Sequence, residues 1–160
     1  MSMEYSAADK YRRMLRAYDV LKRINTDNGN SISNTDARDA TEEFFNQCYH
    51  FKDWLKKDST IQMAQDVERF INGSPSLQLA ADYCNSLKHA GLDRSGRSGK
   101  DIERINTHVK LDLTPRGFVA SSRLEITVSG KSYDAFELAT ECVRAWDDYL
   151  QKNQVSFPEP

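Results

Sequence analysis

The chain of 160 residues has the length of one domain, which is enough to bury a hydrophobic core without disulfides or bound metals. Its 39% hydrophobic and 29% charged residues are typical of a folded, soluble protein and exclude a disordered chain. The formal net charge of −2 disfavours a dedicated duplex-DNA-binding protein, because such proteins carry a larger positive field. No apolar run approaches the roughly 20 residues that span a bilayer, and the N-terminus has no signal-peptide pattern, so we expect a cytoplasmic protein with no membrane partner.

Hydrophobic periodicity predicts two long helices at the start of the chain. From about Ser6 to Ile24, apolar residues recur at spacings of three and four, and a polar run then ends the helix. A longer helix is predicted from about Asp36 to Lys57, with apolar residues of its core stripe at the same spacings.

Two helix-start signals follow. Ser59-Thr60-Ile61-Gln62 has the capping-box pattern and predicts a third helix that ends near Asn72. Ser74-Pro75 places proline directly after an N-cap residue, which predicts a fourth helix that ends before Gly91.

The periodicity then changes from helical to alternating. His108–Leu113 and Arg123–Val128 alternate between apolar and polar residues, which predicts a β-hairpin insertion within residues 105–133. A last helix is predicted from about Asp134 to Lys152, opened by the capping pattern Asp134-x-x-Glu137, and the tail after it is expected to be loose. The sequence thus predicts one mainly α domain over residues 1–160, with a four-helix up-and-down core and an antiparallel β-hairpin before the C-terminal helix.

The three cysteines, Cys48, Cys84 and Cys142, lie far apart and form no Cys-x-x-Cys pair. Each falls in the apolar stripe of a predicted helix, so we expect buried reduced thiols instead of disulfides or zinc ligands. The sequence also lacks a His-Glu-x-x-His motif, a Cys/His cluster and a Gly-x-Ser-x-Gly motif. We therefore expect no metal and no cofactor.

Potential anion-binding groups gather in one stretch of the chain. Asn85-Ser86-Leu87-Lys88-His89 ends the fourth predicted helix, and a Gly/Ser-rich loop at residues 91–101 follows with Arg94, Arg97 and Lys100. Residues 88–116 hold seven Lys or Arg against four Asp or Glu, so this part is locally basic. Such a loop can wrap an anion with its backbone and neutralise it with its cations. A flexible charged linker is the alternative interpretation.

Asn85 and His89 lie four residues apart and share one flank of the predicted helix, so both can contact the same ligand. Lys88 falls close to the apolar stripe, where its ammonium must snorkel to solvent or pair with an acid. A phosphate or a ribose is the ligand that this polar cluster predicts. A helix C-terminus whose macrodipole favours Lys and His, with no ligand, is the alternative.

His50 points away from the core stripe of the second predicted helix, with Asn46 and Asp53 beside it. Asp53 can orient the imidazole as an i, i+3 partner, and a His–carboxylate pair is one ingredient of general acid–base chemistry. A solvated helix face is the alternative.

A helical domain with a polar residue and a histidine one turn apart near a helix end resembles the HEPN superfamily, small all-helical domains of prokaryotic defence and toxin systems. Active members cleave RNA without metal through an Arg-x(4–6)-His motif that faces a dimer mate. The nearest equivalent here is Asn85-Ser86-Leu87-Lys88-His89, with Cys84 at the position of the arginine. The resemblance covers residues 1–90 and the last helix, and it implies a homodimer with His89 as the catalytic residue.

Three hypotheses about function follow from these residues. The first is a non-enzymatic helical module that binds a phosphate-bearing ligand, RNA or a nucleotide, through Asn85, Lys88, His89, Arg94 and Arg97. The second is a metal-independent RNase with His89 as general acid–base and Lys88 or Arg94 stabilising the phosphorane. The third is a protein-interaction domain that docks a partner, or a second copy, through its hairpin or exposed aromatic residues.

Overall fold

The computed structural model describes residues 6–26, 34–63, 65–89, 102–128 and 130–158. The elements within them are, in chain order, α1 (Ala7–Thr26), α2 (Asn34–Lys57), α3 (Val67–Asn72), α4 (Pro75–His89), β1 (Ile102–Thr114), β2 (Gly117–Val128), β3 (Lys131–Asp134) and α5 (Ala135–Lys152). The predicted class is confirmed, because the protein is mainly helical with an antiparallel hairpin before the C-terminal helix.

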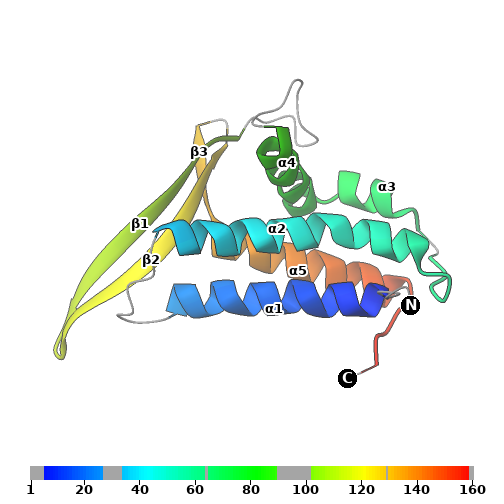
Figure 1. Cartoon of the computed structure of the whole chain (residues 1–160), viewed down its shortest axis with the longest axis horizontal. Coiled ribbons are helices and arrows are strands. Elements are labelled where there is room, and N and C mark those ends of the chain that lie inside the picture. Colours follow the sequence, from blue (N-terminus) through cyan, green and yellow to red (C-terminus); the bar gives the residue numbers. More distant parts are fainter. Residues whose placement is uncertain (1–5, 27–33, 64, 90–101, 129, 159–160) are drawn as a thin grey trace.

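Three long helices, α1, α2 and α5, lie side by side and contact one another (Figure 1). The helix α4 is inclined to them and packs against α2 and α5, while the short α3 lies beside α2 and α4. The hairpin of β1 and β2 begins near one end of this bundle and extends beyond the helices. None of the helices within the described ranges is long and apolar enough to cross a membrane.

Aromatic side chains fill the core between α2, α4 and α5. Trp146 is fully buried and packs edge-on against Phe51, with ring centroids 5.1 Å apart. Its indole N–H donates a hydrogen bond of 3.1 Å to the Cys48 carbonyl, so its burial leaves no donor unpaired. Phe45 of α2 and Tyr83 of α4 pack with centroids 4.9 Å apart. These contacts join α2 to both α4 and α5.

The sheet is antiparallel with strand order β1–β2–β3. The pairing of β1 with β2 runs from Ile102–Val128 to Thr114–Gly117, so both strands are longer than the alternating stretches that predicted them. A third strand, β3, is an addition that the sequence analysis does not predict. Gly130 turns the chain with φ of +76°, a conformation that favours glycine, and β3 then pairs with the last four residues of β2. The short sequence of β3 is polar and carries no strand signal of its own.

The predicted start of the third helix at Ser59 is wrong, because α3 begins only at Val67. The Asp58 carboxylate accepts hydrogen bonds from the backbone N–H and the hydroxyl of Thr60, at 3.0 and 2.6 Å. These bonds hold an Asx-type turn at the place where the capping box predicts the first helical turn.

Contacts with α5 keep the following backbone out of a helix. The Gln65 N–H donates to Asn153 Oδ1 at 3.0 Å, and the Gln65 carbonyl accepts from the Tyr149 hydroxyl at 2.7 Å. The helix therefore begins after Asp66, whose carboxylate caps it by accepting from the Glu68 N–H at 2.8 Å.

The segment after α5 packs on the bundle instead of being loose, as far as residue 158. The Phe157 ring lies 5.4 Å from Tyr11 and 6.4 Å from Phe51, between centroids. The Arg12 guanidinium donates to the Pro158 carbonyl. The prediction of a loose tail is therefore wrong, because the Phe157 ring extends the core over α1.

Asp134 caps α5 as its sequence pattern predicts, since its carboxylate accepts from the Glu137 N–H at 2.9 Å. We expect Asp134→Ala to lower the free energy of unfolding by about 1 kcal/mol, because an N–H of the first turn loses its acceptor. Asp148→Ala, at an exposed position of the same helix, is the matched control and is expected to change it by less than about 0.5 kcal/mol. Urea unfolding measures both values, and equal losses would contradict the capping role.

Candidate functional site

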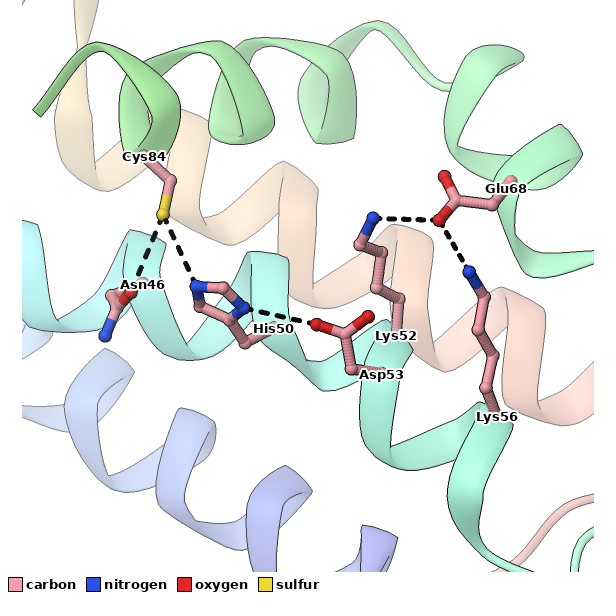
Figure 2. Close-up of polar contacts among 7 residues, drawn as sticks. All are labelled: Asn46, His50, Lys52, Asp53, Lys56, Glu68 and Cys84. Carbon is pink, nitrogen blue, oxygen red and sulfur yellow. Dashed lines mark hydrogen bonds and ion pairs between the residues drawn. The ribbon is translucent and has the colours of Figure 1, made fainter. Parts of the chain in front are cut away.

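One face of α2 carries three polar side chains that are spaced for mutual contact. Asn46, His50 and Asp53 occupy positions i, i+4 and i+7, so they follow one line along the helix. The helix α4 packs across α2 and brings Cys84 to this line (Figure 2). We call Asn46, His50, Asp53 and Cys84 the thiol–imidazole cluster.

The thiol, the imidazole and the carboxylate of this cluster are connected in series. Cys84 Sγ donates to Asn46 Oδ1 at 3.5 Å and lies 3.9 Å from Nε2 of His50. On the other edge of the ring, Nδ1 of His50 lies 3.2 Å from Oδ2 of Asp53. Since a carboxylate only accepts, Nδ1 carries a proton, and in the neutral ring the lone pair of Nε2 is directed to the thiol.

The cluster combines exposed polar groups with a largely buried sulfur. The side chains of His50 and Asp53 are 46% and 42% exposed, whereas Cys84 is only 8% exposed. Because the His50–Asp53 pair is open to water, it adds little to stability, and its effect is to orient the ring. A thiol beside an oriented imidazole can pass its proton to the ring and become a thiolate.

The other two cysteines have different surroundings. Cys48 and Cys142 are 0% exposed, and Cys142 Sγ donates to the Ser76 carbonyl at 3.4 Å. Burial, followed by contact with Cys48, raises the pKa of the Cys142 thiol well above its usual range. All three cysteines are free and buried, as predicted, but Cys84 lies at the edge of the core beside polar partners.

Of the predicted ligand-binding residues at the end of α4, the structure describes the side chain of Asn85 but not those of Lys88 and His89. Asn85 is half-buried and follows Cys84 directly on α4. The helix ends at His89, which puts Lys88 and His89 in its last turn, but their side chains lie outside what the structure describes. Arg94, Arg97, Lys100 and the whole loop at residues 91–101 also lie outside the described residues.

Asp82 is a residue of this region that the sequence analysis misses. It lies one turn before Asn85 on α4 and is 1% exposed. A carboxylate is seldom buried in this way unless it is paired, and Asp82 is not without a partner. Its place among Ala80, Ala81 and Tyr83 in the sequence gives no hint of its burial.

The Cys84–His50 contact could not be found from the sequence either. The line of Asn46, His50 and Asp53 is visible as a helical spacing, but its partner on α4 is set by how the two helices cross. Cys84 reads as one more member of an apolar stripe, because periodicity does not distinguish the centre of a stripe from its edge.

An ion-pair clamp on the same side of α2 holds α3 and hence the start of α4. Glu68 of α3 accepts from the ammonium of Lys52 at 2.8 Å and from that of Lys56 at 2.7 Å (Figure 2). The Lys52 side chain is only 8% exposed, and its ammonium lies 4.5 Å from the centre of the Tyr49 ring.

Burial of Lys52 disfavours its charged form, but the hydrogen bond to Glu68 and the neighbouring Tyr49 outweigh this and raise the pKa of Lys52. Because folding raises the pKa of Lys52, the contribution of this charge to stability is fully present below the ordinary lysine pKa of 10.5 and is lost as the pH rises through the higher folded-state pKa.

In the part of the chain that the structure describes, no three His, Cys, Asp or Glu side chains are placed to hold a metal ion together. Comparisons of the chain with protein-family models, with curated proteins and with solved structures give no significant match. The geometry of the site and the sequence pattern are therefore the basis of the functional proposals below.

We expect Glu68→Gln to lower the free energy of unfolding by about 2 kcal/mol, because the charge of the largely buried Lys52 loses the carboxylate with which it is paired. Lys56→Gln is the matched control, since Lys56 is 41% exposed and its pair contributes about 0.5 kcal/mol. Urea unfolding at neutral pH measures both losses. Equal effects of the two substitutions would show that burial of Lys52 does not make the clamp stronger than a surface ion pair.

Proposed function

We propose that the protein binds a phosphate-bearing ligand, RNA or a nucleotide, on the surface where the last turns of α4 meet α2. The observation that carries this proposal is the contact between Cys84 and His50. It joins two groups of candidate residues that lie far apart in the sequence: His50 and Asp53 on α2, and Asn85 with the residues after it on α4.

The described side chains at this surface suit a phosphate or a ribose. His50 is exposed, and Asp53 holds Nδ1 of its ring. The N–H at Nε2 of the protonated ring, which lies 3.9 Å from the Cys84 sulfur, can then also donate to a phosphate oxygen. The half-buried Asn85, which follows Cys84 on α4, adds an amide that can donate or accept.

Positive charge in this proposal comes from side chains rather than from the helix. A helix C-terminus carries about half a negative charge, so the end of α4 by itself disfavours an anion. Lys88 and His89 in the last turn, and Arg94, Arg97 and Lys100 after it in the sequence, carry enough positive charge to reverse that effect. The proposal assigns binding to these residues and assigns no chemical step.

We further propose that the binding form is a cytoplasmic homodimer. Beyond its pairing with β3, the hairpin of β1 and β2 is a two-stranded ribbon that extends past the helices (Figure 1). An isolated two-stranded ribbon is marginally stable in water, so a second copy is the expected partner. The mass of one chain is 18.3 kDa, and light scattering coupled to size-exclusion chromatography should give twice this mass. The mass of a single chain would exclude the homodimer.

Binding is tested with a short single-stranded RNA oligonucleotide and with AMP, ADP and ATP, at low and physiological salt. We expect the triple variant Lys88→Ala/Arg94→Ala/Arg97→Ala to bind at least about tenfold more weakly and to flatten the salt dependence, because three phosphate contacts are lost. Added to the triple variant, His50→Gln should weaken binding further, because the proposed contact between His50 and the phosphate is also lost.

The matched control removes three exposed cations elsewhere, with the variant Arg23→Ala/Arg144→Ala/Lys152→Ala on α1 and α5. It makes the same change in net charge and should retain the affinity of the unmodified protein. Equal affinities of the two triple variants, or no binding to any of these probes, would exclude the proposed site.

A further inference from the structure

Cys84 differs from the other two thiols of the chain in three respects. Its sulfur lies 3.9 Å from an imidazole nitrogen, it touches a side-chain amide, and both of these partners are exposed to solvent. Cys48 and Cys142 are closed inside the core. A reactive cysteine needs a proton acceptor and access from solvent, and of the three thiols only Cys84 has both.

The imidazole is oriented for the role of proton acceptor. Asp53 fixes the proton on Nδ1 of His50, so that Nε2 faces Sγ of Cys84 with its lone pair. After proton transfer, the products are a thiolate and an imidazolium, and the Asp53 carboxylate stabilises the imidazolium.

Asn46 can satisfy the sulfur in both of its protonation states. Its carbonyl oxygen accepts the single thiol proton at 3.5 Å, and rotation about the Cβ–Sγ bond turns the same proton toward Nε2 of His50. Rotation of the amide by half a turn brings its NH₂ group to the same place, where it donates to a thiolate. The ionised sulfur therefore has two donors, His50 and Asn46, which offset the cost of holding a charge at the edge of the core.

We propose that Cys84 is a nucleophilic thiol that undergoes exchange with low-molecular-weight disulfides, with His50 as its base and Asp53 as a positioning residue. The 8% exposure of Cys84 limits access to small reagents and excludes a bulky protein disulfide. This modification site does not depend on phosphate binding, and its test uses a different readout.

The exchange balances without any further reactant. His50 takes the proton of Cys84, and the thiolate attacks one sulfur of a disulfide RSSR, forming a Cys84–S–S–R bond while the R–S–S–R bond breaks. The leaving thiolate takes the proton from His50 and departs as RSH. The disulfide reagent is the oxidant, and one protein thiol is converted into a mixed disulfide.

The first experiment treats the native protein at pH 7 with glutathione disulfide and follows intact mass, with peptide mapping to locate the adduct. We expect a single glutathione adduct on Cys84 and none on Cys48 or Cys142. We also expect Cys84 to react faster in the native protein than in urea, although it is more exposed in urea. A slower native rate at Cys84, or adducts on the two core cysteines at the same rate, would overturn the proposal.

Variants test the roles of His50 and Asp53. His50→Gln should slow adduct formation at least about tenfold, because a positioned base is removed. If the ring only shields the sulfur, the same variant reacts at an unchanged or higher rate, which would overturn the proposal. Asp53→Asn should slow the reaction by a smaller factor, and Asp53→Glu should restore it. Thermal unfolding of each variant, with an unchanged melting temperature, shows that the fold is intact.

Discussion

Trp146 of α5 fixes the position of that helix against α2 through a buried hydrogen bond to the α2 backbone. The indole N–H has no water to bind, and it donates to the Cys48 carbonyl. A shift of α5 along α2 leaves this buried donor unpaired, at a cost of about 1–3 kcal/mol. The edge-on packing of Trp146 against Phe51 of α2 resists rotation of the same two helices. Because the inner face of α2 is fixed in this way, the face with Asn46, His50 and Asp53 is fixed too.

The candidate site also requires that α4 lie in the correct position against α2. Side-chain packing and the ion pairs of Glu68 with Lys52 and Lys56 set this position. The Tyr83 ring packs at a tilt against Phe45, although the described residues offer no hydrogen-bond partner to its buried hydroxyl. The apolar contact of this ring therefore outweighs the cost of that hydroxyl. Glu68, held by Lys52 and Lys56, fixes α3, which leads directly into α4. The Tyr83 contact and the Glu68 ion pairs together hold α4 against α2, and Cys84 therefore reaches His50.

The two proposals use the same imidazole in different ways. In phosphate binding, a protonated His50 is a donor to an external oxygen, and Cys84 serves only to hold the helices in contact. In disulfide exchange, the neutral His50 is an acceptor for the proton of Cys84. Substitutions of the basic residues after Cys84 affect the first role alone, whereas removal of the sulfur abolishes the second. The roles are therefore separable by experiment even though the residues are neighbours.

The elements with strong local signals could be predicted from the sequence alone. Helical periodicity and caps predicted α1, α2, α4 and α5 to within a few residues, and the Asp134 cap formed as its pattern indicates. Three other features depended on long-range partners. The late start of α3 depends on Tyr149 and Asn153, the strand β3 on β2, and the packing of Phe157 on Tyr11.

The candidate site also has a part that the sequence predicts and a part that it does not. The His50–Asp53 pair is local, three residues apart on one helix, and was predicted. The approach of Cys84 was decided only by the tertiary structure, because the crossing of two helices depends on side-chain packing over the whole core and not on the spacing within either helix.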